Sequence, residues 1–338
     1  MRKTPLFALR PLRTLRTLCA LCTLCTVTVA VLGAIMTPTA TAATKKKTTT
    51  TKPKAPAPTP TPVAVPKTVP TLKIATIPDQ DPAKLQRQFA LVSQFLGAKT
   101  GLKVEYVPVT EYTAAVSGYR IGDLDLVWFG GLTGVQAAKQ LPGSLYLGQR
   151  DVDERFKSVF IANSSFKAPT IDSVGKLTYI KGESLTFGSE ISTSGRLMPQ
   201  FFLDEAGLDL SDFKGQPGFS GSHDKTIRLV EAGTFTIGAL NKAVWDSNVA
   251  NKTVDTSKVR VIFETPSYYD YHWLARPDID KKFGAGTAAK LQAAILGLNK
   301  DVPEQKAILD LFSASSFIST KADNYALIEK TAKKLGLL

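Results

Sequence analysis

The chain has 338 residues and a formal net charge of +13, from 42 Lys and Arg residues against 29 Asp and Glu residues. Residues 1–70 hold 11 of these basic residues and no acidic residue, so the rest of the chain is close to neutral. Because no basic surface remains for the folded part of the chain, the charge argues against a nucleic-acid partner.

Residues 1–42 have the order of a secretory signal peptide. Five basic residues precede an apolar stretch from Leu18 to Ile35, and Ala40-Thr41-Ala42 offers a cleavage site after Ala42. A retained membrane anchor is the alternative, since an apolar run of about 18 residues is the lower limit for spanning a bilayer. We therefore expect a secreted, periplasmic or otherwise extracytoplasmic protein, which is membrane-associated only if this segment is retained.

All three cysteines, Cys19, Cys22 and Cys25, lie inside this apolar stretch. Their spacing is similar to an iron–sulfur or zinc ligand set, but no fourth ligand lies nearby. The only histidines, His223 and His272, are far apart in the sequence and have no cysteine near them. We therefore predict no metal site and no cofactor.

Residues 43–70 consist almost wholly of Thr, Lys, Pro, Ala and Val. Such a composition cannot bury enough apolar surface to fold, and its prolines favour an extended chain. We interpret this segment as a disordered, solvated linker.

From Leu72 onward, strand-like apolar runs alternate with amphipathic helical patterns. Asp81 before Pro82 supplies a helix cap followed by proline at the first helical position. We expect strands at 72–77, 103–107 and 124–129 and helices at 82–99, 112–121 and about 132–140. This βαβαβα series predicts an α/β fold with a mostly parallel sheet covered by helices on both faces.

A second unit of the same kind begins near Lys157. We expect strands at 158–162, 185–188, 235–240 and 259–263, and helices at 196–206 and 225–232. The last strand returns the chain to the first unit, which predicts two lobes joined by two crossovers, with residues 71–157 and 264–338 in lobe 1 and 158–263 in lobe 2. Ligands of such sheets bind beyond the carboxyl ends of the strands, so we expect a ligand cleft between the lobes.

The segment Gly188-Ser189-Glu190-Ile191-Ser192-Thr193-Ser194-Gly195 joins a predicted strand to a predicted helix. A helix start has unpaired N–H groups and a partial positive charge, and Ser192, Thr193 and Ser194 add three hydroxyl groups to it. An ordinary N-cap needs only one hydroxyl group. Three in a row favour an anion-binding loop.

Gly130-Gly131-Leu132-Thr133 occupies the equivalent place in the first lobe, after the strand that ends in Trp128-Phe129. A plain glycine turn capped by Thr133 is the alternative. Two helix starts that face each other across a cleft could clamp one anion, with Gly131 and Thr133 on one side of it.

His223 begins a third helix, after Ser220-Gly221-Ser222. A histidine at a helix start suits hydrogen bonding to an oxyanion. A hydrolase with His223 as base and Ser220 or Ser222 as nucleophile is the alternative, although the glycine that would end a GxSxG elbow is replaced by Ser222. Asp224 is adjacent to His223 and cannot face it on a helix, which weakens this triad.

Together these segments resemble the phosphonate, phosphite and selenate branch of the periplasmic binding proteins of ABC importers, from about residue 72 to residue 338. The matching segments are Ile77-Pro78-Asp79-Gln80-Asp81-Pro82, Val109-Thr110-Glu111-Tyr112, the residues from Asp123 to Gly131, Ser192-Thr193-Ser194-Gly195, and Phe219-Ser220-Gly221-Ser222-His223-Asp224. The sequence around Trp128-Phe129-Gly130-Gly131 is most similar to that of the selenate-type subgroup.

The resemblance implies a two-lobed, type II-like receptor that holds a small tetrahedral oxyanion and delivers it to an ABC permease. The implied ligand-binding residues are Tyr112, Thr133, Ser192, Thr193, Ser194, His223 and Asp270, and Gly131 completes the predicted site. We expect no covalent chemistry and a monomeric protein. An oxyanion-sensing receptor domain is the alternative function.

Two departures from the family pattern concern specificity. Phosphonate binders that hold an aminoalkyl tail usually have a tyrosine at the position of Gly134 and a second carboxylate at that of Ala243. Both absences predict a small ligand without an amine: phosphite, a phosphonate, phosphate or selenate. Asp270 favours a ligand that keeps an acidic hydrogen, because a buried carboxylate repels a fully ionised anion.

Overall fold

The computed structural model describes residues 70–338. The predicted signal peptide, and the predicted linker apart from Pro70, lie outside the described residues. Within residues 70–338, no helix combines the length and the apolar character that crossing a membrane requires.

The first of two sheets has six strands in the order β11-β4-β10-β3-β1-β2. β1 pairs in parallel with β2 and β3, whereas β10 is antiparallel to both β3 and β4, and β11 is antiparallel to β4. The strands are β1 (Leu72–Thr76), β2 (Val104–Tyr106), β3 (Leu126–Phe129), β4 (Leu145–Arg150), β10 (His272–Ala275) and β11 (Phe317–Ile318).

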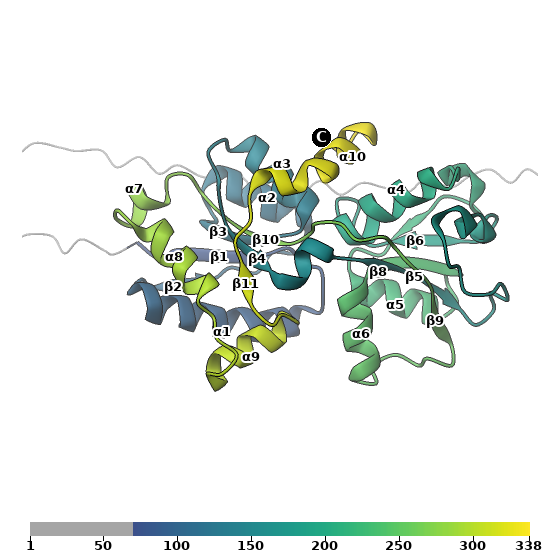
Figure 1. Ribbon diagram of the computed structural model, residues 1–338, viewed down its shortest axis with the longest axis horizontal. Helices are drawn as coiled ribbons and strands as arrows, with labels where there is room; N and C mark the ends of the chain where they lie inside the picture. The colour runs from purple at the N-terminus through teal and green to yellow at the C-terminus, as the bar shows by residue number, and fades with distance from the viewer. Residues whose placement is uncertain (1–69) are drawn as a thin grey trace, which may run out of the picture. The chain divides into compact units, whose positions relative to one another are not determined.

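The second sheet has five strands in the order β7-β6-β8-β5-β9. β6 is parallel to β7 and β8, and β5 is antiparallel to β8 and β9. The strands are β5 (Ser158–Asn163), β6 (Leu185–Phe187), β7 (Gly218–Phe219), β8 (Ile237–Asn241) and β9 (Val259–Glu264). Figure 1 shows the two sheets in separate parts of the molecule, each with its own helices.

Most strands of each sheet point the same way, as predicted, but both sheets are mixed, because β10 and β11 in the first sheet and β5 in the second run in the opposite direction. A strand that follows a covering helix from its neighbour must run parallel to it. β5 and β10 instead enter their sheets directly from the other sheet, so no such crossover sets their direction. The α/β class itself is as predicted.

The helices cover the faces of the sheets (Figure 1). They are α1 (Pro82–Thr100), α2 (Tyr112–Ile121), α3 (Gly131–Gln140), α4 (Met198–Glu205), α5 (His223–Glu231), α6 (Lys242–Ala250), α7 (Ile279–Phe283), α8 (Thr287–Leu296), α9 (Pro303–Leu311) and α10 (Ala326–Lys334). The carboxylate of Asp81 accepts the N–H groups of Ala83 and Lys84, as its predicted capping role requires. The helix ends at Gly101, whose φ of 74° suits glycine.

The predicted helix at 196–206 begins earlier, as a π-helical turn η3 (Thr193–Leu197) that continues into α4. The Ser192 hydroxyl oxygen accepts the N–H of Gly195 at 3.0 Å and caps this turn. The wide turn brings the backbone of Gly195 against that of Gly188, where an added Cβ would lie 3.1 Å from the Gly188 Cα. π-Helical turns are rare and occur often at functional sites.

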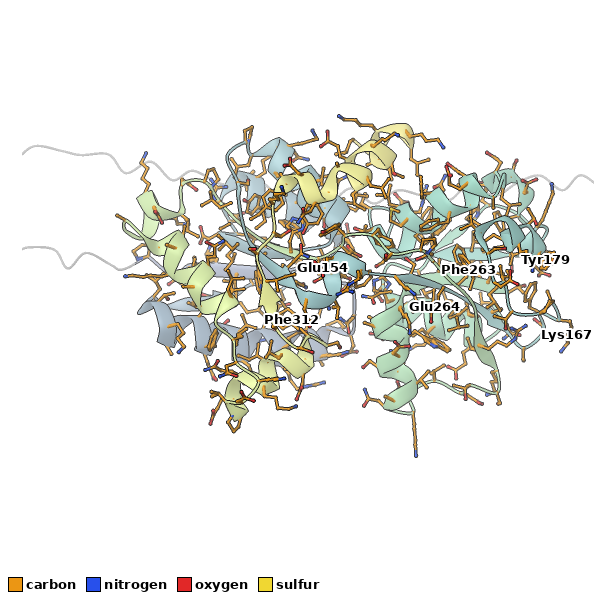
Figure 2. All side chains as sticks on the ribbon, viewed as in Figure 1. Glu154, Lys167, Tyr179, Phe263, Glu264 and Phe312 are labelled. Carbon is orange, nitrogen blue, oxygen red and sulfur yellow. The ribbon has the colours of Figure 1, made fainter. Side chains whose placement is uncertain are left out.

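The two segments that connect the sheets run side by side. Phe156, in the first connection, forms an isolated bridge with Tyr268 in the second. The Lys157 ammonium group lies 3.3 Å from the carboxylate of Glu264, a residue labelled in Figure 2. At the carboxyl end of the chain, α10 packs against both α3 and α4 and so contacts helices of both sheets.

Candidate anion-binding site

The two predicted anion loops meet. The Leu132 N–H in the first turn of α3 donates to the Thr193 hydroxyl oxygen, with 2.9 Å between the two atoms. A Cβ added at Gly130 would lie 3.3 Å from that same oxygen. The sequence predicted that these loops face each other across a cleft, and the structure brings them into direct contact.

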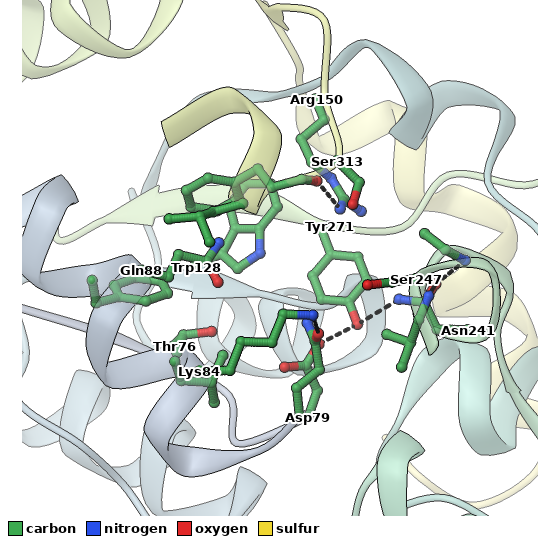
Figure 3. Close-up of a pocket in the computed structure, with 17 residues that line it drawn as sticks. Thr76, Asp79, Lys84, Gln88, Trp128, Arg150, Asn241, Ser247, Tyr271 and Ser313 are labelled. Carbon is green, nitrogen blue, oxygen red and sulfur yellow. Dashed lines mark hydrogen bonds between the residues drawn. The ribbon is translucent and has the colours of Figure 1, made fainter. Parts of the chain in front are cut away.

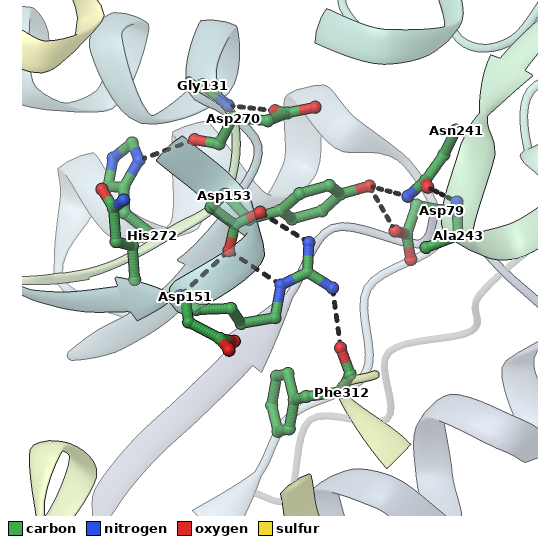
Figure 4. Close-up of polar contacts among 12 residues, drawn as sticks. Asp79, Gly131, Asp151, Asp153, Asn241, Ala243, Asp270, His272 and Phe312 are labelled. Atoms are coloured by element: carbon green, nitrogen blue, oxygen red, sulfur yellow. Dashed lines mark hydrogen bonds and ion pairs between the residues drawn. The ribbon is translucent and has the colours of Figure 1, made fainter. Parts of the chain in front are cut away.

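Asp270 lies beside the start of α3 and is fully buried. Its Oδ1 accepts the Gly131 N–H at 2.8 Å (Figure 4). Its Oδ2 is buried and has no partner that meets hydrogen-bond geometry within residues 70–338, although the Thr193 hydroxyl lies close enough to lower the pKa of the carboxyl group. Burial raises the pKa of this carboxyl group to about 7, although the Gly131 N–H acts in the opposite direction. Near neutral pH, Asp270 can therefore either donate or accept a proton.

His223 is the first residue of α5 and is fully buried. The Asn241 backbone N–H donates to its Nδ1 at 3.5 Å. Because a backbone N–H can only donate, Nδ1 is the unprotonated nitrogen and Nε2 carries the proton. Burial lowers the pKa of the imidazole to about 4, so the ring is neutral. Its Nε2 is buried and finds no partner in the described part of the chain, so it is a donor without an acceptor.

Tyr112 is the first residue of α2 and is 3% exposed. Its hydroxyl oxygen is buried and has no partner that meets hydrogen-bond geometry among the described residues. Burial raises its pKa well above 10, and the nearby Ser192 hydroxyl only partly offsets this effect. The phenol is therefore a second protonated donor without an acceptor.

These side chains lie close to one another. Asp270 and Ser192 are both close enough to Tyr112 to affect its pKa. A Cβ added at Gly195 would lie 3.2 Å from the His223 ring and 3.0 Å from the Ser192 hydroxyl oxygen. Buried polar atoms left unpaired cost about 1–3 kcal/mol each, so unpaired atoms gathered in one place indicate that a polar ligand completes them.

The two remaining predicted residues, Thr133 and Ser194, are buried beside these groups. The Thr133 hydroxyl donates to the Gly130 carbonyl at 3.0 Å, as the capping alternative predicted. The Ser194 carbonyl accepts the Ser158 hydroxyl at 2.7 Å. The structure thus brings all eight predicted residues together: Tyr112, Gly131, Thr133, Ser192, Thr193, Ser194, His223 and Asp270.

Sequence reasoning missed two buried polar residues next to this site. Asp79 follows β1 and is 4% exposed, and its Oδ2 accepts the Tyr271 hydroxyl at 2.7 Å. Burial raises the pKa of Asp79 to about 6. Its place just beyond the carboxyl end of a parallel strand was the available signal.

A small cavity adjoins Asp79 and Tyr271, and Ala243 lines its wall (Figure 3). Its volume of about 20 Å³ has room for roughly one or two water molecules. None of the eight predicted ligand-binding residues lines this cavity, so the link between Ala243 and ligand size stays a prediction.

The interpretation of Gly134 as a position where a tyrosine of the ligand site is absent is wrong. A Cβ at this position would lie 2.1 Å from the His272 Nε2. The His272 ring packs against Tyr146 and Tyr325 inside the first sheet's core. Gly134 is therefore required by the close approach of His272 to α3.

The serine and aspartate side chains that a hydrolytic triad would need form hydrogen bonds with other groups instead. The Ser220 hydroxyl donates to the Ser222 carbonyl at 2.9 Å, and the Ser222 hydroxyl caps α5. The Asp224 carboxylate accepts the Asp81 N–H at 2.8 Å and the Asn248 amide at 3.0 Å, and it does not orient His223. No group of three or more potential metal ligands is found within residues 70–338.

The fold and the site agree with one protein class. Residues 74–325 match the family described as "ABC transporter, phosphonate, periplasmic substrate-binding protein". The chain therefore belongs to this family of substrate-binding components of ABC importers, which function outside the cytoplasm with a membrane permease.

Individual relatives support this assignment. The chain is 47% identical over 266 residues to the probable ABC transporter phosphite binding protein PhnD1 of Prochlorococcus marinus (strain MIT 9301), covering 78% of this chain and 90% of that protein. The structure of PhnD1 in complex with methylphosphonate matches with a TM-score of 0.78 and 46% identity, over 79% of this chain and 99% of that chain. The phosphonates-binding periplasmic protein of Escherichia coli is 23% identical over 251 residues, covering 73% of this chain and 71% of that protein.

These similarities confirm the predicted two-lobed binding-protein fold and the predicted role in solute import. The oxyanion-sensing receptor and the hydrolase find no support in them. The resemblance to a selenate-type subgroup stays a prediction.

Proposed function

We propose that this protein captures phosphite or a phosphonate as small as methylphosphonate and presents it to its permease without covalent chemistry. The ligand binds between lobe 1 (71–157 and 264–338) and lobe 2 (158–263), and the protein acts as a monomer outside the cytoplasm. The names of the PhnD1 relatives support the ligand class. A hinge motion between the two lobes would close the protein around the bound ligand.

The observation that carries this proposal is that three of the eight buried side-chain atoms without a hydrogen-bond partner in residues 70–338 belong to predicted site residues: Tyr112 Oη, His223 Nε2 and Asp270 Oδ2. Two of them are donors for ligand oxygens. The third can share a proton with the ligand. An oxyanion that exchanges a proton near neutral pH satisfies all three, and the hydroxyl groups of the Ser-Thr-Ser loop surround its other oxygens.

Calorimetry with a panel of ligands tests the ligand class. We expect phosphite and methylphosphonate to bind more tightly than sulfate or selenate, which bring no acidic hydrogen near neutral pH. We also expect 2-aminoethylphosphonate to bind more weakly than methylphosphonate, because Ala243 supplies no carboxylate for its amine. A site that prefers sulfate or the aminoethyl ligand would contradict the proposal.

Truncating the polar groups of the site should weaken binding without unfolding the protein. Ser192→Ala, Thr193→Ala and His223→Ala are each expected to weaken phosphite or methylphosphonate binding by about 1–3 kcal/mol, since each leaves a buried polar group unpaired. Ser93→Ala is the control, because it removes a hydroxyl that bonds only within α1. Unchanged affinity in all three site variants would refute the site.

A further inference from the structure

Four residues form a closed ring of hydrogen bonds beside the site. The Tyr271 hydroxyl donates to the Asp79 carboxylate at 2.7 Å, and the Asn241 side-chain amide donates to the Tyr271 oxygen at 3.4 Å. The Asn241 backbone N–H donates to the His223 Nδ1 at 3.5 Å. The His223 backbone N–H donates to the Asp79 carbonyl at 2.9 Å, which closes the ring. Figures 3 and 4 show the bonds around Asp79 and Asn241.

The ring joins the two lobes. Asp79 follows β1 and Tyr271 precedes β10, so both belong to the part of the chain that forms the first sheet. Asn241 ends β8 of the second sheet, and His223 begins α5, which packs against β8. Two of the four bonds, Asn241 to Tyr271 and His223 to Asp79, therefore cross between the lobes. All four residues are at most 4% exposed.

The ring determines what His223 presents to the ligand. The bond at Nδ1 leaves the proton on Nε2, and the bond from the backbone N–H fixes the start of α5 to the first lobe. The Asn241 side chain cannot move freely, because its Oδ1 also caps α6 by accepting the N–H groups of Ala243 and Val244. Its amide NH₂ is thereby directed towards Tyr271.

We infer that Asp79, Tyr271 and Asn241 are positioning residues, which hold the Nε2–H form of His223 towards the bound oxyanion when the two lobes are together. They act through His223. This inference rests on the proposed function, because it assumes that His223 binds the oxyanion.

Two substitutions at Asp79 separate the hydrogen bond from the charge. Asp79→Asn and Asp79→Ala both remove the negative charge, but only the asparagine keeps an acceptor for the Tyr271 hydroxyl. We expect Asp79→Ala to weaken methylphosphonate binding by about tenfold relative to Asp79→Asn, the usual effect of one buried hydrogen bond. Calorimetry measures these affinities at about pH 7.5. At this pH the Asp79 carboxyl group of the unchanged protein, with a pKa of about 6, is mainly ionised.

Tyr271→Phe removes the hydroxyl from the middle of the ring but keeps the stacking of the ring on Trp128. We expect about a tenfold loss of affinity and a change in the imidazole ¹⁵N chemical shifts of His223, away from those of a single Nε2–H tautomer. Tyr119→Phe is the matched control. It removes an equally buried hydroxyl that bonds to Ser144 and Ala275 inside the first lobe, and affinity should change less than about twofold.

The outcomes distinguish the two proposals. If the unchanged protein binds neither methylphosphonate nor phosphite, the proposed function fails. If it binds them, and both Tyr271→Phe and Asp79→Ala keep its affinity and its His223 ¹⁵N shifts, the positioning role fails. If Tyr271→Phe does not fold, the affinities and the His223 ¹⁵N shifts of Asp79→Asn and Asp79→Ala are sufficient to test the positioning role.

Discussion

Replacing Asp153 by alanine is expected to lower the free energy of unfolding by about 3–5 kcal/mol. The Asp153 carboxylate is fully buried and makes a two-point ion pair with Arg150, with Nη2–Oδ1 at 2.6 Å and Nε–Oδ2 at 2.7 Å. The Arg150 guanidinium is enclosed by the rings of Trp128, Phe156 and Tyr271. Without Asp153 it would remain a buried charge with no hydrogen-bonded carboxylate, because arginine cannot lose its proton.

Denaturant unfolding measures this effect. Asp172→Ala is the matched control, since it also removes an aspartate from an ion pair, with Lys176, but at the surface. Exposed ion pairs contribute about 0–1 kcal/mol, so this variant should be nearly as stable as the unchanged protein. The double variant Arg150→Met with Asp153→Leu removes both charges and should regain much of the loss. Equal stability of Asp153→Ala and Asp172→Ala would contradict this account.

Binding of phosphite above pH 7 is expected to take up about one proton, and the affinity should fall by about tenfold per pH unit. Burial holds the pKa of Asp270 at about 7 before any anion arrives. Below this pH the carboxyl group already carries its proton. Above it, the group is ionised and repels an ionised ligand unless a proton enters with the ligand.

No other acidic or imidazole group of the site changes its charge between pH 7 and about 9. Burial keeps His223 neutral, with a pKa of about 4, and keeps Tyr112 protonated, with a pKa well above 10. Asp79, with a pKa of about 6, is mainly ionised throughout this range. The proton uptake therefore reports on Asp270 together with the ligand itself.

Calorimetry in two buffers of different ionisation enthalpy counts the protons. Asp270→Asn is the control, because the amide oxygen can still accept the Gly131 N–H and the amide NH₂ supplies a permanent donor in place of the shared proton. We expect this variant to bind without proton uptake and with little pH dependence over this range. Proton uptake that persists in Asp270→Asn, or that is absent in the unchanged protein at about pH 8.5, would show that Asp270 does not share a proton with the ligand.

The sequence predicted most elements because their signals are local. The cap at Asp81 and the glycine after Thr100 mark both ends of α1, and the observed helix differs from the predicted one by a single residue at its end. Local signals also marked two other helix starts: two consecutive glycines at Gly131, and three consecutive hydroxyl residues around Thr193. Local signals could therefore place most of the candidate site.

What the sequence could not predict depends on contacts between distant residues. The bond from Tyr271 to Asp79 joins positions that are 192 residues apart. The need for glycine at position 134 comes from the His272 ring, which no local pattern around either residue indicates. The antiparallel direction of β5 and β10 likewise follows from how the chain passes between the sheets. A family pattern aligned to Gly134 therefore led to a wrong role for that residue.

The position of β10 between β3 and β4 has a consequence for the order of folding. All strands of the second sheet lie within residues 158–264, so that sheet can form as soon as this stretch of chain is available. The first sheet lacks an inner strand until residues 272–275 arrive, which leaves the facing edges of β3 and β4 unpaired. During synthesis or export, the earliest-made half of the molecule should therefore be the last to become compact, and its open strand edges are where a chaperone or a second chain would bind.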